Sequence, residues 1–133
     1  MRKKPVSNKK RGTDFENRVV EIMAANGCWA RPMYPDPAGN QPFDVLALKR
    51  SVSYAFDCKT CCEPVFELSR VEPNQWTALD MFYKKVDESV VGILALHDGK
   101  IYFIPYEYLV HVRNHGGKAV NLHEGNRWEF DHN

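Results

Sequence analysis

Residues 43–60 read FDVLALKRSVSYAFDCKT, and this stretch decides the fold. Its apolar and β-branched content predicts two strands, at 43–49 and 53–60. A tight polar turn near Arg50-Ser51 joins them. The stretch therefore predicts an antiparallel pair at the centre of a sheet.

Three charged side chains interrupt this apolar pair. Side chains alternate along a strand, so Asp57 and Lys59 project from the same face. Pairing of the two strands brings Asp44 close to Asp57. Two carboxylates and a lysine are typical of metal-assisted phosphodiester cleavage, in which oxygen ligands hold Mg²⁺. The alternative is a polar strand start and an exposed ion pair on an edge strand, and the residues alone leave both readings open.

The rest of the chain predicts helices and strands around this pair. Thr13-Asp14-Phe15-Glu16 fits a capping box that opens a first helix, which ends at Gly27. Further elements are expected as follows: a strand at 28–34, a Pro-rich loop at 35–42, an extended piece at 65–68, a helix at 73–85, strands at 90–96 and 101–104, and a short helix at 106–112. No element is assigned after residue 114. The order α-β-β-β-α-β-β predicts a mixed α/β domain with one central sheet.

Charge is distributed unevenly over the 133 residues, although the net charge is only +1. Residues 1–11 hold six basic side chains and no acid, and the remaining residues carry 12 basic against 17 acidic side chains. We expect a basic, flexible arm at 1–11 and a single domain at 12–133. The arm either contacts a polyanion or is a solvated terminus, and charge alone leaves both open.

Apolar runs and cysteines exclude other classes. No apolar run approaches the roughly 20 residues of a membrane-spanning helix, and no apolar stretch follows the basic N-terminus as in a secretory signal. Four cysteines without a second Cys/His pair at zinc-finger spacing favour free thiols in a reducing cytoplasm. We therefore expect a cytoplasmic protein.

The charged residues also resemble a known family. Glu16, Asp44 and Asp57-x-Lys59 resemble the E…D…(D/E)-x-K pattern of the PD-(D/E)XK nuclease superfamily, most closely that of Holliday-junction resolvases. Further motifs resemble the archaeal Hjc and bacterial RecU types: Arg11-Gly12-x-x-Phe15-Glu16 (both types), Phe56-Asp57-Cys58-Lys59-Thr60, Phe66-x-Leu68-Ser69-Arg70 and Gln75-x-x-x-Leu79 (RecU), and Tyr102-Phe103-Ile104-Pro105 with Tyr108-Leu109 (the closing segment). The short Pro35–Pro42 loop leaves no room for a RecU-type stalk, and Hjc-type enzymes commonly have Glu in place of Asp57.

The resemblance implies a fold and a set of roles. The fold would be a restriction-endonuclease-like α-β-β-β-α-β core, with one central mixed sheet flanked by helices. Asp44, Asp57 and the Cys58 backbone carbonyl would hold Mg²⁺, for which Mn²⁺ can substitute. Lys59 would be the catalytic lysine. Glu16 would be a metal or water ligand, unless it only caps the helix. Gln75 would support the site, unless it is an exposed first-turn residue.

The implied activity is resolution of four-way DNA junctions in recombination and repair. Two alternatives stay open: a nuclease for another class of DNA, and a non-catalytic DNA-binding module. Symmetric cutting implies a C2 homodimer, with an interface on Val90–Leu96, Ile101–Ile104 or the helix of Trp76. The expected DNA contacts are basic: Lys3, Lys4, Lys9, Lys10, Arg11, Arg18, Arg31 and Arg70.

Overall fold

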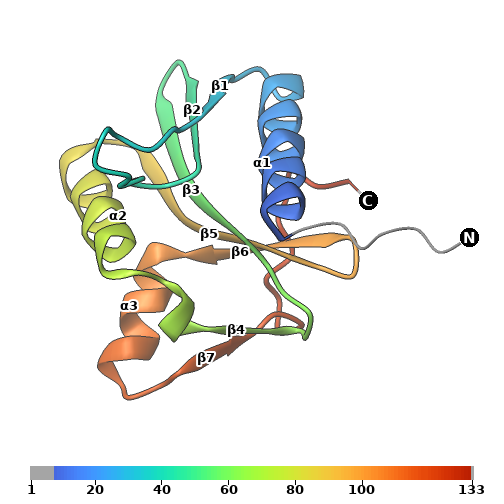
Figure 1. The fold of residues 1–133 in the computed structure, drawn as a ribbon, viewed down its shortest axis with the longest axis vertical. Coiled ribbons are helices and arrows are strands. Elements are labelled where there is room, and N and C mark those ends of the chain that lie inside the picture. Colours follow the sequence, from blue (N-terminus) through green and yellow to red (C-terminus); the bar gives the residue numbers. More distant parts are fainter. Residues whose placement is uncertain (1–7, 133) are drawn as a thin grey trace, which may run out of the picture.

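A computed structural model describes residues 8–132, without the side chains of residues 8, 9 and 11. The elements along the chain are α1 (Asn8–Ala25), β1 (Trp29–Pro32), β2 (Val45–Lys49), β3 (Val52–Thr60), β4 (Val65–Glu67), the 3-10 helix η1 (Leu68–Arg70), α2 (Pro73–Lys85), β5 (Ser89–His97), β6 (Lys100–Pro105), α3 (Tyr106–Asn114) and β7 (Ala119–Asn121). They form a mixed α/β fold, as the order of the predicted elements indicates (Figure 1).

The central sheet has five strands in the order β1-β2-β3-β5-β6. Strands β1, β2 and β3 pair antiparallel, β3 and β5 run parallel, and β6 returns antiparallel to β5. In the β2–β3 register Val45 faces Phe56, so Asp44 and Asp57 follow at the next position, just past the last pair. Because β3 and β5 run parallel, the chain between them must cross over to the other end of the sheet. This crossover contains β4, η1 and α2.

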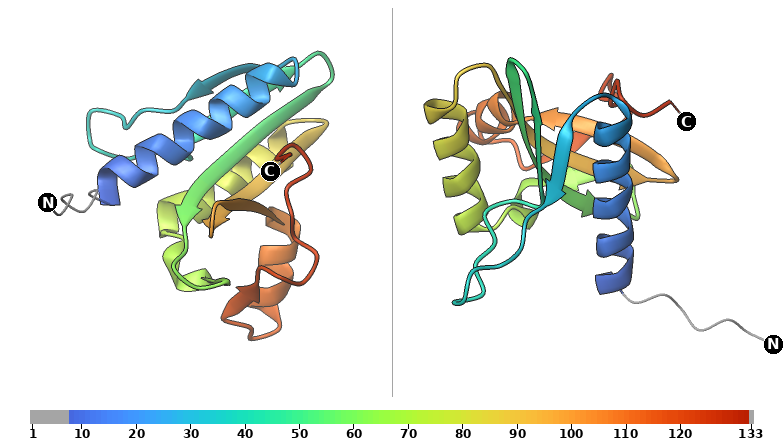
Figure 2. Two further views of the ribbon diagram at one scale, coloured as in Figure 1. Left: turned by 90° about the vertical axis from the view of Figure 1, so that its right-hand side faces the viewer. Right: turned by 90° about the horizontal axis from the view of Figure 1, so that it is seen from above.

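Helices cover both faces of the sheet, which explains why its central strands are apolar on both sides. Helix α1 lies on one face, and α2 and α3 lie on the other (Figures 1 and 2). Phe15, Val19 and Met23 of α1 are buried, at the spacing of one helical face, in one of two apolar clusters. Leu79 of α2 and Leu109 of α3 are wholly buried in the other.

Two further predictions about local structure are confirmed. Helix α2 begins at Pro73 and ends at Lys85, where a first-turn proline indicates its start. Asp98 and Gly99 form the turn between β5 and β6 with positive φ angles of 51° and 74°. Two positive φ angles are typical of the turn that matches the twist of a two-residue hairpin.

The predicted start of the first helix is wrong. Helix α1 begins at Asn8, so Thr13 and Glu16 lie inside it and do not form an N-terminal capping box. Lys9, Lys10 and Arg11 therefore belong to α1, and Gly12 is tolerated within the helix at a cost of about 1 kcal/mol relative to alanine. Residues 1–7 lie outside the described part of the chain, so the flexible arm stays a prediction.

Residues after 114, for which no element was expected, complete the fold. Strand β7 pairs antiparallel with β4 in a second sheet, and Val120 is buried there. Farther on, Trp128 is buried against Phe56 with ring centroids 5.7 Å apart. Tyr102 of β6 forms a bridge with Arg127, so this segment covers the outer edge of β6.

The dimer interface stays a prediction, and burial limits which side chains of the expected segments could form it. Ile93 and Leu94 of β5 and Ile101 and Ile104 of β6 are wholly buried within the chain. These side chains therefore offer no surface to a second copy. Within residues 8–132, no helix combines the length and the hydropathy that crossing a membrane requires.

Candidate active site

The site begins with Asp57 and Lys59, neighbours on one face of β3. Asp57 is wholly buried, and its Oδ2 lies 3.3 Å from the Lys59 Nζ. The alternative of an exposed ion pair on an edge strand is wrong, because β3 lies at the centre of the sheet between β2 and β5. A buried carboxylate needs a partner of opposite charge, and Lys59 provides it.

Asp44 lies beside Asp57 because the backbone of Asp44 continues the hydrogen bonding between neighbouring strands. Its N–H donates to the Phe56 carbonyl at 2.9 Å, and its carbonyl accepts from the Met33 N–H at 2.8 Å. Its side chain reaches β3, where Oδ2 accepts the Cys58 N–H at 2.6 Å. Its Oδ1 accepts from the Gln41 amide at 2.7 Å. Both oxygens of Asp44 are therefore oriented by hydrogen bonds.

Gln75 connects the α2 helix to β3. Its Nε2 donates to the Asp57 Oδ1 at 3.2 Å, and its Oε1 accepts from the Lys59 Nζ at 3.3 Å. The same Oε1 accepts the Glu72 N–H at 3.0 Å, a bond of the helix N-terminus. Gln75 is therefore a first-turn residue that is half-buried and contacts the site, and the alternative of an exposed first-turn residue is wrong.

Glu16 approaches the site from α1. Burial, followed by the charge of Asp44, raises the pKa of Glu16 from 4.5 to about 7, against the opposing charge of Lys59. Desolvation and a like charge both disfavour an ionised carboxyl group, and here they act together. The three carboxyl groups of Glu16, Asp44 and Asp57 thus share one small region.

The environment of Asp57 disfavours its ionised form. Burial and the charge of Asp44 raise its pKa well above the usual range, and Lys59 opposes this shift. Its Oδ2 is buried and receives no hydrogen bond from the described residues. A buried carboxylate oxygen of this kind is an available ligand for a cation.

The donor chemistry fits Mg²⁺. Carboxylate and carbonyl oxygens are the ligands this ion prefers, and they include the Asp57 Oδ2, which accepts no hydrogen bond from the described residues and lies 3.3 Å from the Lys59 Nζ. The N–H and C=O of one residue point to the same side of a strand, so the Cys58 carbonyl faces the side where its N–H meets Asp44. Among the described side chains, no group of three or more His, Cys, Asp or Glu could hold a metal ion. Glu16 therefore does not complete a three-carboxylate metal site with Asp44 and Asp57 in this structure. The donors that fit the ion are the two aspartates and the Cys58 carbonyl, and Mg²⁺ commonly takes one or two carboxylates and keeps several waters.

The predicted DNA contacts fall into four groups, of which Arg18 and Arg70 form the last. Lys3 and Lys4 lie outside the described residues. Lys9, Lys10 and Arg11 lie on the first turns of α1, where Lys10 is exposed and pairs with Asp14 at 3.4 Å. Arg31 lies on the edge strand β1, with its guanidinium 5.8 Å from the centroid of the Trp29 ring. Their role in binding DNA stays a prediction.

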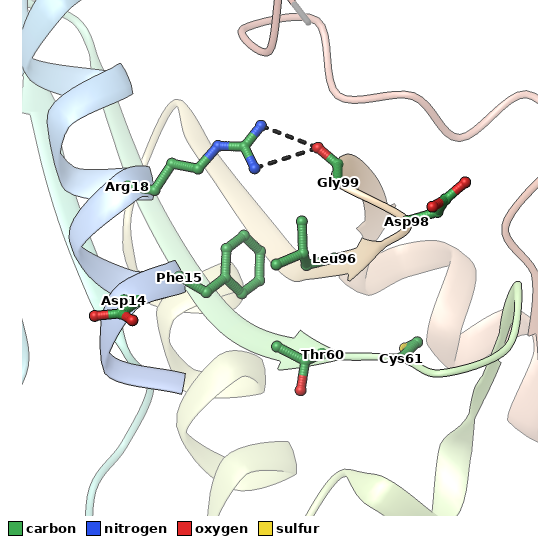
Figure 3. A pocket seen from close by; sticks show the side chains of 8 residues that line it. All are labelled: Asp14, Phe15, Arg18, Thr60, Cys61, Leu96, Asp98 and Gly99. Carbon is green, nitrogen blue, oxygen red and sulfur yellow. Dashed lines mark hydrogen bonds between the residues drawn. The ribbon is translucent and has the colours of Figure 1, made fainter. Parts of the chain in front are cut away.

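Arg18 and Arg70 form contacts within the chain. Arg70 donates to the Thr60 carbonyl at 2.8 Å. Arg18 donates to the Gly99 carbonyl at 3.2 Å (Figure 3). It also donates to the buried Asp131 at 3.1 Å, so it links α1, the β5–β6 turn and the C-terminal segment. These guanidinium groups stabilise the fold. Fewer of their N–H donors are therefore available to bind a phosphate.

Figure 3 shows the pocket beside these contacts. It has a volume of about 510 Å³ and lies between α1, the end of β3 and the β5–β6 turn. Phe15 and Leu96 form its apolar wall, and it is also lined by Thr60, the last residue of β3, and Cys61, the next residue. The five candidate site residues are not among its lining residues, so this pocket flanks the site and does not contain it.

Sequence reasoning missed Gln41, which contacts Asp44 from the loop between β1 and β2. Its position three residues before Asp44 was the only signal in the sequence. The four cysteines are free, as expected.

Comparisons with known proteins agree with this arrangement. No protein-family model and no curated protein matches the sequence. Among solved structures, the chain is similar to Hjc of Archaeoglobus fulgidus, a Holliday junction resolvase from an archaeal hyperthermophile. The TM-score is 0.59 at 16% sequence identity, and the match covers 73% of this chain and 74% of that one. The chain therefore has the fold of this resolvase, with a central mixed sheet flanked by helices.

Proposed function

We propose that this protein is a metal-dependent endodeoxyribonuclease that cuts branched DNA, in the manner of a Holliday-junction resolvase. One observation carries the proposal: Asp44, Asp57, Lys59 and Gln75 meet at the place where β2 and β3 separate, linked by hydrogen bonds or ion pairs of 2.6 to 3.3 Å through the β3 backbone and side chains. The similarity to Hjc adds support for branched DNA as the substrate.

The site residues divide the chemistry of hydrolysis among them. Asp44, Asp57 and the Cys58 carbonyl would hold Mg²⁺, which when bound polarises the phosphate and acidifies a coordinated water. Lys59 Nζ neutralises negative charge that develops on the phosphate in the transition state. Gln75 keeps Lys59 and Asp57 in fixed positions. Glu16, with a pKa near neutrality before a cation binds, is suited to accept a proton from water at a carboxylate oxygen.

The decisive experiment compares a synthetic four-way junction with a linear duplex of the same arm sequence, in Mg²⁺ and in EDTA. We expect cutting of the junction in Mg²⁺ only. Asp57→Asn and Lys59→Ala should each lower the cutting rate by at least about a hundred-fold while junction binding persists. Asp87→Asn and Lys85→Ala, the same charge changes at exposed positions at and just beyond the end of α2, are matched controls that should cut normally.

Three results would contradict the proposal. Equal cutting of the linear duplex would indicate a nuclease for another class of DNA. Binding of junctions without cutting in Mg²⁺ or Mn²⁺ would indicate a non-catalytic DNA-binding module. Equal cutting by Asp57→Asn and the unaltered chain would show that the site lies elsewhere.

A C2 homodimer is part of the proposal, because cutting two strands symmetrically requires two sites related by a two-fold axis. Sedimentation equilibrium of the protein alone and with the junction tests it. A dimer with one junction bound is expected, and a monomer that makes single nicks would contradict this part alone.

A further inference from the structure

Gln41 contacts the carboxylate of Asp44 from outside the proposed catalytic set. Its Nε2 lies 2.7 Å from the Asp44 Oδ1 and 3.3 Å from the Phe43 carbonyl oxygen. The other oxygen of Asp44 accepts the Cys58 N–H at 2.6 Å. Two donors on different oxygens prevent the carboxylate from rotating, and each oxygen keeps a second lone pair for another partner.

The loop that carries Gln41 holds its own shape. Asp36 Oδ1 accepts from the backbone N–H groups of Ala38 and Asn40, each at 2.9 Å. The Asp36 N–H donates to the Asn40 carbonyl, also at 2.9 Å. Such side-chain bonds to the backbone are the usual way in which Asp stabilises a turn. The loop therefore presents Gln41 from a folded scaffold.

The first turn of α2 fixes the same loop from the other side. The Asn74 Nδ2 donates to the Gln41 carbonyl oxygen at 3.1 Å. The next residue, Gln75, donates to Asp57. One helical turn is thus connected to both aspartates: to Asp44 through Gln41, and to Asp57 directly.

We propose that Gln41 is a positioning residue, which orients the Asp44 carboxylate for the cation. The inference rests on the proposed function, because it assumes that Asp44 is a metal ligand. Carboxylates that bind metals are themselves oriented by hydrogen bonds, and loss of such a partner typically lowers metal affinity or activity 10- to 100-fold. Gln41 supplies this bond here, with α2 as its anchor.

The test measures Mn²⁺ binding by calorimetry or by electron paramagnetic resonance, without DNA. Gln41→Met keeps the length and volume of the side chain and removes the amide, and Gln41→Ala removes both. We expect both variants to bind Mn²⁺ about 10- to 100-fold more weakly. Their unfolding in EDTA should stay close to that of the unaltered chain. Asn40→Ala is the control, because the loop contacts of Asn40 come from its backbone.

Kinetics on the junction give a second readout. The Mg²⁺ concentration for half-maximal cutting should rise in Gln41→Met, and the KM for DNA should not. Asn74→Ala should move the Mg²⁺ requirement in the same direction. Its effect should not add fully to that of Gln41→Ala, because the two residues act in one chain of contacts.

Each outcome decides the matter. Unchanged Mn²⁺ affinity in both Gln41 variants overturns the positioning role, and a rise in KM alone would assign Gln41 to DNA contact. If the unaltered chain binds Mn²⁺ but cuts no DNA, the proposed function fails, while the Mn²⁺ titrations still decide the role of Gln41. If the unaltered chain binds no Mn²⁺, the positioning role fails together with the metal site.

Discussion

In the absence of metal, replacing Glu16 with glutamine should stabilise the folded protein, but only at pH values above about 4.5. The pKa of Glu16 rises from 4.5 to about 7 on folding because of burial and the charge of Asp44. Between these pH values the folded chain holds a proton that the unfolded chain has lost, so stability falls as the pH rises. Above pH 7 the folded state bears the full free-energy cost of ionising Glu16. Below pH 4.5 this cost disappears, because Glu16 is protonated in both the folded and the unfolded chain.

The size of this cost follows from the two pKa values. A pKa difference of this size would correspond to about 3 kcal/mol for a wholly buried group, at about 1.4 kcal/mol per pH unit. Glu16 is only half-buried, and water screens its charge. We therefore expect the Glu16→Gln variant to be about 1.5 kcal/mol more stable than the unaltered chain at pH 8, and equally stable at pH 4.

Urea unfolding in EDTA, followed by tryptophan fluorescence, to which the buried Trp128 contributes, measures both stabilities across this range. Glu21→Gln, the same change at an exposed position on α1, is the matched control and should show no such dependence. An identical pH profile for Glu16→Gln and the unaltered chain would refute the reasoning. It would mean that Glu16 does not lie beside Asp44 in solution.

Two further predictions concern the frame around the site. Gly92→Ala should destabilise the chain by about 3 kcal/mol or more, because a Cβ there would lie 2.2 Å from the backbone oxygen of Ile104 and β5 cannot move away from β6. A urea midpoint equal to that of the unaltered chain would contradict this contact. Asp131→Ala should cost about 1 to 3 kcal/mol in the same assay, because it leaves the buried Ile101 N–H without its acceptor and Arg18 without its ion pair. Unchanged stability would show that the C-terminal segment does not dock.

Local signals predicted most of the core. The β2–β3 turn, the start of α2 at Pro73 and the Asp98-Gly99 turn each depend on a few consecutive residues. The placement of Asp57 and Lys59 on one face follows from strand alternation alone. These parts of the fold needed no knowledge of distant contacts.

The contacts that sequence reasoning missed join residues far apart in the chain. Asn74 reaches Gln41 across 33 positions, and Asp131 reaches Arg18 across 113. The start of α1 was missed for a different reason. Thr13 and Glu16 have the spacing of a capping box, but the residues before them extend the helix to Asn8. Strand β7 has only three residues and forms because β4 offers it a partner.

Asp44 and Asp57 differ in burial and in hydrogen bonding, and this difference indicates different roles in binding a cation. Asp44 accepts N–H bonds on both oxygens, so its orientation is set before any cation arrives. Asp57 is wholly buried, and its Oδ2 receives no hydrogen bond from the described residues. Burial and the charge of Asp44 raise the pKa of Asp57, and Lys59 only opposes this shift, so a cation beside Oδ2 would favour the ionised form of Asp57. We therefore expect a bound cation to stabilise the ionised form of Asp57, and Asp44, oriented by Gln41, to determine where the cation lies.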